Sequence, residues 1–292
     1  MHISAVKNIE GIGWALLATA LFATAAAMAK VAVQDYHVLQ ILFFRQLVVF
    51  LSSLPSIAKS FPASLKTEYP VLHACRLSGA FVALSCGIWA VAVLPLTTAV
   101  TLGFAQVFFV SLLAFLFLQE KVGIHRVIAV VTGFFGVVVV MRPAVDGLFE
   151  VYALIPLVGA LGAAIAITSV RTLSQTESTA TLLVYQAVFV GLLAGIPLFW
   201  FWKTPNLFGL LFLLAMGVLA AIGQWVGVRA LRAGEASVVS NIDYVKLIYA
   251  GAFGYFLFAE IPDVYTLAGA AIIIGSSVYL SIRESGKRRI GV

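Results

Sequence analysis

The residues best suited to chemistry are polar and charged groups inside long apolar stretches. Asp243 and Lys246 stand three residues apart in the apolar segment 236–258, a spacing that puts both side chains on one face of a helix. Lys246 would lie about 16 Å along that helix, near the middle of a bilayer. Ionisable groups at this depth usually face a cavity or a partner of opposite charge. They indicate either a substrate contact or a structural ion pair between the two residues.

A weak internal repeat brings further polar positions to the same depth. When the chain is shifted against itself by 140 residues, segment 97–120 falls on segment 237–260, and each ends on a glutamate. Lys246 then corresponds to Gln106, and Asn241 corresponds to Thr101. A single Gln or Thr in a membrane helix often bonds only to a neighbouring helix. Matching polar positions in both halves nevertheless favour one shared site.

An amide and an aromatic ring, Gln224 and Trp225, lie between Gly223 and Gly227 in another apolar segment. An interfacial tryptophan beside a close helix contact would explain them equally well. With these alternatives open, we predict a substrate site near the bilayer midplane. Its eight candidate residues are Lys246, Asp243, Gln106, Asn241, Thr101, Tyr244, Trp225 and Gln224.

Four other charged residues in or beside the apolar segments are interpreted as structural. Arg45 and Arg76 lie close enough to a segment end to extend their charges to the interface. Glu120 and Glu260 close the two repeated segments at opposite faces. We expect each glutamate to latch neighbouring helices as the two halves move.

These residues belong to a chain whose composition excludes a water-soluble body. Of its 292 residues, 62% are apolar or aromatic and 10% are charged, against about 25% charged in soluble domains. A soluble enzyme, a disulfide scaffold, a disordered chain and a nucleic-acid-binding protein are therefore excluded. The net charge of +6 does not indicate a nucleic-acid-binding surface, because the loops between the apolar segments are too short to form an aqueous domain. The composition predicts an all-α polytopic membrane protein.

Ten apolar segments are long enough to cross a bilayer as helices. They are 11–33, 38–57, 70–92, 96–118, 124–141, 151–170, 179–200, 206–228, 236–258 and 264–282. With the N-terminus inside, the cytoplasmic side holds twelve Lys and Arg residues and the outer side holds three. Since basic residues favour the cytoplasmic face, we expect both termini in the cytoplasm.

The repeat divides the ten segments into two units of five, residues 1–145 and 146–292. An odd number of crossings per unit places the two units in opposite orientations. Inverted repeats of this kind are typical of secondary transporters, whose substrate site lies near the midplane where the repeats meet. The sequence therefore predicts one integral membrane domain built from two inverted five-helix repeats.

In these features the chain resembles the drug/metabolite transporter superfamily, and within it the EamA-type exporters. The resemblance rests on the ten segments and on the glutamates at the ends of two of them. It also rests on Phe43-Phe44-Arg45 and on the sequence at the end of the fourth segment, residues 116–121. It is strongest for the branch that exports aromatic and neutral amino acids, and it implies amino-acid export across the inner membrane. One departure is the polar run 241–246, where that branch often has an apolar sequence with a proline.

The sequence contains no phosphate-binding loop and no zinc-protease motif, so we expect a transporter without cofactor or metal, and no enzyme. A zwitterionic substrate would place its carboxylate at Lys246 and its ammonium at Asp243, and Asp243 could also carry a coupled proton. The expected partners are this small molecule, the lipid bilayer and possible coupling protons, and no nucleic acid. An exporter of drugs or organic cations is the alternative, which Lys246 disfavours by repulsion. A membrane enzyme would need a carboxylate pair or a histidine cluster.

Overall fold

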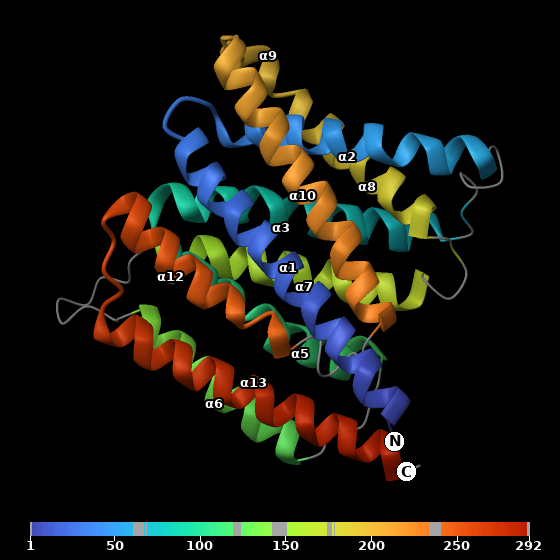
Figure 1. Ribbon diagram of the computed structural model, residues 1–292, viewed down its shortest axis with the longest axis vertical. Coiled ribbons are helices and arrows are strands. Elements are labelled where there is room, and N and C mark those ends of the chain that lie inside the picture. Colours follow the sequence, from blue (N-terminus) through green and yellow to red (C-terminus); the bar gives the residue numbers. More distant parts are fainter. Residues whose placement is uncertain are drawn as a thin grey trace.

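The computed structural model describes residues 2–60, 67, 69–118, 124–141, 151–173, 177, 179–233 and 241–290. In these ranges the regular structure is helical throughout (Figure 1). The elements are α1 His2–Ala32, α2 Val38–Ser60, α3 Pro70–Val93, α4 Leu96–Gly103, α5 Gln106–Leu118, α6 Ile124–Met141, the 3₁₀ turn η2 Val151–Ala153, α7 Leu154–Leu173, α8 Thr179–Gly195, α9 Leu198–Phe201, α10 Leu207–Ala233, α12 Val245–Phe258 and α13 Val264–Ile290.

Six helical stretches are long and apolar enough to cross a membrane. They are Glu10–Ala32, Val38–Pro55, Pro70–Val93, Leu96–Leu116, Val151–Val170 and Leu207–Gly227. Four shorter apolar helices accompany them, namely Val127–Met141, Thr181–Gly195, Val245–Phe258 and Val264–Leu280. Large apolar side chains such as Phe199 and Phe256 point outward, 88% and 79% exposed, as lipid-facing residues do. The all-helical membrane class is thus confirmed, while ten complete crossings stay a prediction.

The most extensive helix packing joins the first half of the chain to the second. Helix α3 packs on α7, α1 on α10, α6 on α13 and α2 on α8. Figure 1 shows α6 and α13 side by side along one edge of the molecule. The halves therefore interlock and form one body.

Two of these crossings depend on glycine. A methyl group added at Gly79 of α3 would lie 2.6 Å from the carbonyl oxygen of Gly162 on α7. A methyl group at Gly269 of α13 would lie 2.7 Å from the carbonyl oxygen of Gly136 on α6. Glycine lets helix backbones approach this closely, as is common inside membranes. Each helix pair therefore touches main chain to main chain.

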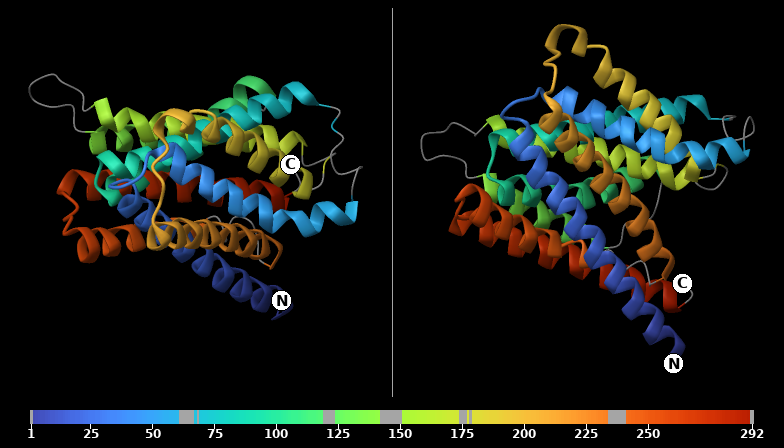
Figure 2. Two further views of the ribbon diagram at one scale, coloured as in Figure 1. Left: turned by 90° about the horizontal axis from the view of Figure 1, so that it is seen from above. Right: turned by 45° about the horizontal axis from the view of Figure 1, so that its top comes forward.

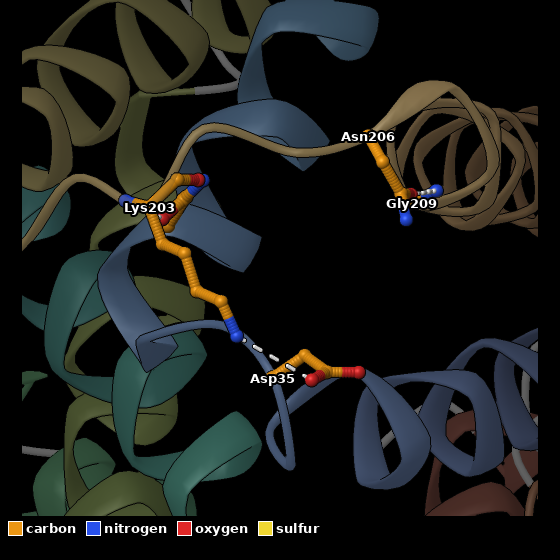
Figure 3. Close-up of polar contacts among 5 residues, drawn as sticks. Asp35, Lys203, Asn206 and Gly209 are labelled. Atoms are coloured by element: carbon orange, nitrogen blue, oxygen red, sulfur yellow. Dashed lines mark hydrogen bonds and ion pairs between the residues drawn. The ribbon is translucent and has the colours of Figure 1, made fainter.

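Both chain ends lie at one end of the molecule, called here the terminal end, and the opposite end is the far end (Figures 1 and 2). At the far end the link between α9 and α10 is fixed to the first helix pair. The Gln40 side chain donates to the Lys203 carbonyl at 2.7 Å and accepts from the Lys203 N–H at 3.2 Å. Lys203 also lies 3.4 Å from Asp35, and the Asn206 side chain caps α10 at the Gly209 N–H (Figure 3). These contacts hold the start of α10 against α2.

Candidate substrate cavity

A cavity of about 700 Å³ lies among the helices of both halves. Its wall comes from α1, α2, α3, α4 and the start of α5, and from α7, α10 and the start of α12. Helix α1 shows why space remains there. Phe22, Ala25, Ala26 and Ala29 recur at spacings of three and four residues and all line the cavity, so they share one helix face. Because three of these four residues are alanines, that face leaves room for a ligand.

Three charged side chains line the cavity: Arg45 from α2, Asp243 and Lys246. Asp243 is exposed, and Arg45 and Lys246 are half-buried. In the described part of the chain, no ion pair or hydrogen bond engages any of these three side chains. The Lys246 ammonium lies 5.9 Å from the ring centroid of Phe22. The cavity therefore presents charges of both signs that can engage a ligand.

The structure shows no ion pair between Asp243 and Lys246, which bears on the two interpretations of their spacing. Three residues apart on a helix, the side chains could have bonded to each other. Lys246 is within electrostatic range of Asp243, yet the two groups form no ion pair. This geometry leaves both side chains available to a ligand, and their role as substrate contacts stays a prediction.

The cavity also lies where a helix is interrupted in the first half. Helix α4 ends at Gly103, and α5 begins at Gln106 after the pair Phe104-Ala105. The N–H groups of Phe104 and Ala105 donate three residues back, at 3.1 and 3.0 Å, which is 3₁₀ geometry. Gln106, the first residue of α5, lines the cavity. The sequence predicts one continuous helix over 96–118, and the structure replaces it with two helices.

A matching interruption precedes α12 in the second half. Asp243 and Tyr244 form a turn, and the N–H of Lys246 donates three residues back to the Asp243 carbonyl at 3.0 Å. Lys246 is the second residue of α12, and it stands 140 positions after Gln106. Interrupted helices at corresponding places in two halves are a feature of transporter sites. The positive ends of the α5 and α12 dipoles also favour an anionic group beside them.

Four of the eight predicted site residues come together here. Lys246, Asp243, Gln106 and Gln224 all line the cavity. The signal that pointed to these four residues is the burial rule for polar groups. A charged or amide side chain deep in an apolar segment needs a polar partner or a cavity, and in this molecule it faces the cavity.

The other four predicted residues do not line the cavity. Thr101 is fully buried, and its hydroxyl donates to the Thr97 carbonyl of its own helix at 2.8 Å. Trp225 is 61% exposed on the outside of α10, where Arg229 lies over its ring. Asn241 is half-buried, one turn before α12. Thr101 is thus bonded within its own helix and Trp225 faces outward, and a substrate contact by any of these residues stays a prediction.

Tyr244, the last of the four, supports the wall of the cavity from behind. Its ring packs against Phe104, with centroids 4.9 Å apart, and Phe104 itself lines the cavity. The two residues occupy the two interruptions, so this contact joins one break to the other.

Arg45 lines the cavity although the sequence analysis interpreted it as structural. Its position near the end of a span allowed its charge to extend to the interface. The signal that could have found it is the same one that identified Lys246, an ionisable group in a span. No Asp or Glu occurs in α2 to pair with Arg45.

Arg76 corrects the same interpretation in another way. It does not extend to the interface, because it is only 3% exposed. One guanidinium nitrogen donates to the Gln186 side chain at 3.2 Å. Its neighbour His73 has Nε2 2.5 Å from Glu177, and the Thr67 hydroxyl donates to the same carboxylate at 2.5 Å. We call His73, Thr67 and Glu177 the terminal-end cluster.

A second cluster lies at the far end of the molecule, beside the cavity-lining residue Ala29. Lys30 of α1 forms an ion pair with Glu260 at 2.6 Å and donates to the Leu94 carbonyl at 2.7 Å. Glu260 also accepts from the Leu96 N–H, at the start of α4, at 2.8 Å. Lys30 directly follows Ala29, which lines the cavity. We call Lys30, Glu260 and these backbone groups the far-end cluster; they join the ends of α1, α3, α4 and α12.

Glu260 thus links helix ends, as the sequence analysis expects of it. Its counterpart in the repeat, Glu120, lies outside the described residues.

The fold and the cavity define a helical membrane protein with a central pocket, and sequence comparison shows its family. The pattern of the EamA-like transporter family matches residues 9–142 and again 151–282. The chain therefore belongs to the EamA-like transporter family, as its resemblance predicts.

Curated relatives align over most of the chain and carry different substrate names. The chain is 27% identical to the S-adenosylmethionine uptake transporter of Rickettsia bellii, over 94% of each chain. It is 30% identical to the pseudopaline exporter CntI of Pseudomonas aeruginosa, over 95% of this chain and 98% of the relative. It is 29% identical to a riboflavin transporter of Brucella anthropi, over 85% and 89%. All three are named as transporters of small metabolites.

The fold also occurs among solved structures. A crystal structure superposes with a TM-score of 0.63 over 98% of this chain and all of the other, at 14% sequence identity. At that identity the similarity concerns the fold.

Proposed function

We propose that the protein is a secondary transporter that exports amino acids by alternating access. The observation that carries the proposal is the pair of unpaired charges, Lys246 and Asp243, in a central cavity. An α-amino acid carries one carboxylate and one ammonium group a few ångströms apart. Lys246 and Asp243 offer one charge of each sign three residues apart. The substrate would therefore complete both pairs at once.

The surroundings suit this arrangement. A carboxylate at Lys246 also faces the N-terminal ends of α5 and α12, whose dipoles stabilise negative charge. The amides of Gln106 and Gln224 can donate to the carboxylate or accept from the ammonium. Phe22 and the small residues of α1 give the substrate side chain an apolar wall.

We further propose that two inverted five-helix repeats, residues 1–145 and 146–292, carry out the transport cycle. The family pattern matches the chain twice, in stretches of similar length. The packing pairs are those that a two-fold relation between the halves would give. In such a relation α1 corresponds to α7, and α3 corresponds to α10. The contact between α3 and α7 then has its counterpart in the contact between α10 and α1, and both helix pairs pack extensively. The two helix interruptions map onto each other in the same way.

The far-end cluster supports a state that is closed at the far end. There α1 packs against α3 and is tied to it through Lys30 and Leu94. The corresponding helices at the terminal end are α7 and α10, and their described residues show no packing of comparable extent. This asymmetry is expected of a transporter whose site opens toward the terminal end. Transport would then require the far-end cluster to break.

We place both termini in the cytoplasm of a bacterial-type inner membrane. The excess of Lys and Arg near the terminal end supports this orientation. The direction, export, follows the resemblance to EamA-type exporters; the named relatives include both an uptake transporter and an exporter.

The proposal is tested with purified protein in proteoliposomes. Uptake of radiolabelled amino acids is measured beside S-adenosylmethionine and riboflavin, for wild type, Lys246→Ala and Asp243→Asn. Lys203→Ala is the matched control, because Lys203 is an exposed lysine away from the cavity. We expect saturable amino-acid uptake that both cavity variants lose and that Lys203→Ala retains.

Two results would contradict this proposal. Folded wild-type protein that transports no amino acid but does transport riboflavin or S-adenosylmethionine would refute the amino-acid assignment. Equal loss of transport in Lys203→Ala and Lys246→Ala would refute the location of the site. Direction is measured separately in cells, as intracellular accumulation of the substrate when the protein is deleted.

A further inference from the structure

The charges of the cavity do not balance for a simple zwitterion. Arg45 and Lys246 supply two positive charges, and Asp243 supplies one negative charge. The described residues that line the cavity include no fourth charged group. A neutral amino acid would pair with Lys246 and Asp243 and would leave Arg45 alone. A half-buried charge without a partner is costly, so Arg45 calls for an anion of its own.

We propose that Arg45 binds a second anionic group of the substrate, and that the preferred substrate is an amino acid with two carboxylates. This inference rests on the proposed function and deepens it. Such a molecule carries a net charge of −1 and neutralises the excess positive charge of the cavity. One carboxylate lies at Lys246, the ammonium lies at Asp243, and the second carboxylate lies at Arg45.

The side chain of Arg45 is positioned for this role. Helix α2 is held between α8 and α10, so Arg45 projects from a fixed element. Its neighbours in sequence, Phe44 and Gln46, are 6% and 1% exposed, whereas Arg45 faces the cavity. A guanidinium donates two parallel hydrogen bonds to one carboxylate, a geometry that a lysine cannot reproduce. Arg45 can therefore select a carboxylate over an amide of the same shape.

The placement of the two cations on different helices supports two separate anionic groups. Arg45 lies on α2 and Lys246 on α12, and each is close enough to act electrostatically on the other. A single carboxylate would relieve this repulsion at one point, whereas two carboxylates satisfy each cation directly. The volume of about 700 Å³ is in the range that holds drug-sized ligands. A substrate longer than a small neutral amino acid therefore fits.

Glutamate and glutamine provide a sharp test, because they share a shape and differ by one charge. Proteoliposome uptake of each is measured at neutral pH for wild type, Arg45→Gln, Arg45→Lys and Arg76→Gln. In wild type we expect the half-saturation concentration for glutamate to be at least about tenfold lower than that for glutamine. The reason is that a charge-assisted hydrogen bond is stronger than one to a neutral amide. Arg45→Gln should weaken glutamate uptake much more than glutamine uptake and so lose that preference, and Arg45→Lys should restore part of the preference.

Arg76→Gln is the matched control, since Arg76 is a buried arginine within a span but lies outside the cavity. It should change the uptake of both substrates by the same factor. Size-exclusion profiles and thermal unfolding in detergent check that each variant is folded.

The outcomes separate the two proposals. Wild-type uptake of glutamine without glutamate would overturn the role of Arg45 and leave amino-acid transport standing. An equal decrease for both substrates in folded Arg45→Gln would assign Arg45 a structural role and would also overturn the inference. Failure of every amino acid in folded wild-type protein would overturn the proposed function together with this inference.

Discussion

The two ends of the molecule hold polar clusters of similar composition but different exposure. At the far end, the side chains of Lys30 and Glu260 are 14% and 21% exposed. At the terminal end, those of His73 and Glu177 are 3% and 6% exposed. A charged pair that keeps contact with water loses less solvation when it forms, and less stabilisation when it opens. The far-end cluster is therefore suited to opening, and the terminal-end cluster is suited to permanent support.

The helices that each cluster joins lead to the same distinction. The far-end cluster links α1, α4 and α12, all of which line the cavity. The terminal-end cluster links α3 to the residues just before α8, and none of its members lines the cavity. We therefore expect opening of the first cluster to change access to the cavity, and opening of the second only to loosen the scaffold.

The largest effect on stability is expected from Glu177→Ala at the terminal end. It leaves His73 and Thr67 without their shared acceptor in a buried place, at a cost of about 3 kcal/mol. The midpoint of thermal unfolding in detergent should fall by several degrees. Glu177→Gln keeps an oxygen acceptor, so its unfolding midpoint should fall less. Equal midpoints for wild type and Glu177→Ala would show that this cluster does not support the scaffold.

Lys30→Met should change access to the cavity more than stability. Loss of the ion pair with Glu260 favours states open at the far end. In a variant with Cys75 and Cys86 replaced by serine and Ala29 by cysteine, an impermeant thiol reagent on the far side should react several-fold faster after Lys30→Met. Lys203→Met, at the same end but away from the cavity, is the control. Unchanged reactivity at position 29 would refute a closing role for the cluster.

The smallest effect is expected from Asp35→Asn, which removes the exposed ion pair with Lys203 at the far end. The side chains of Asp35 and Lys203 are 71% and 60% exposed, and such pairs contribute about 0.5 kcal/mol or less. Transport and thermal unfolding should match wild type. Gln40→Ala provides the contrast, because Gln40 is fully buried and bonds twice to the backbone of Lys203. Destabilisation by Asp35→Asn as large as that by Gln40→Ala would contradict this ranking.

The positions of the helices follow from the sequence, because apolar length and polar breaks are local properties. The interruptions at Phe104-Ala105 and Asp243-Tyr244 do not, because neither pair contains proline or glycine. The N–H groups of Phe104, Ala105 and Tyr244 find carbonyls three residues back, so at these positions the break leaves no unpaired donor that would require a special residue. Packing across the molecule selects these two turns, and a single sequence does not display that packing.

The candidate site was predictable where a polar group has no local partner. Lys246 and Gln224 cannot satisfy their side chains within an apolar helix, and both face the cavity. A threonine can bond to its own helix, and Thr101 does so. Tryptophan suits the membrane interface as well as a ligand, and Trp225 lies on the outside of the molecule. Arg45 is not identified from the sequence, because a long charged side chain near the end of a span can extend either to the membrane interface or into a cavity.

The contact between Gly79 and Gly162 has a consequence for the size of molecule that the cavity admits. Helices α3 and α7 form adjacent parts of its wall, and their lining residues meet: a methyl group at Gly159 of α7 would lie 3.8 Å from the backbone nitrogen of Gly87 of α3. Because the two backbones already touch, any larger side chain at Gly79 or Gly162 would push the helices apart and change the shape of this side of the cavity. A relative that keeps both glycines can exchange its other lining side chains, and with them its substrate chemistry, while this part of the wall stays in place.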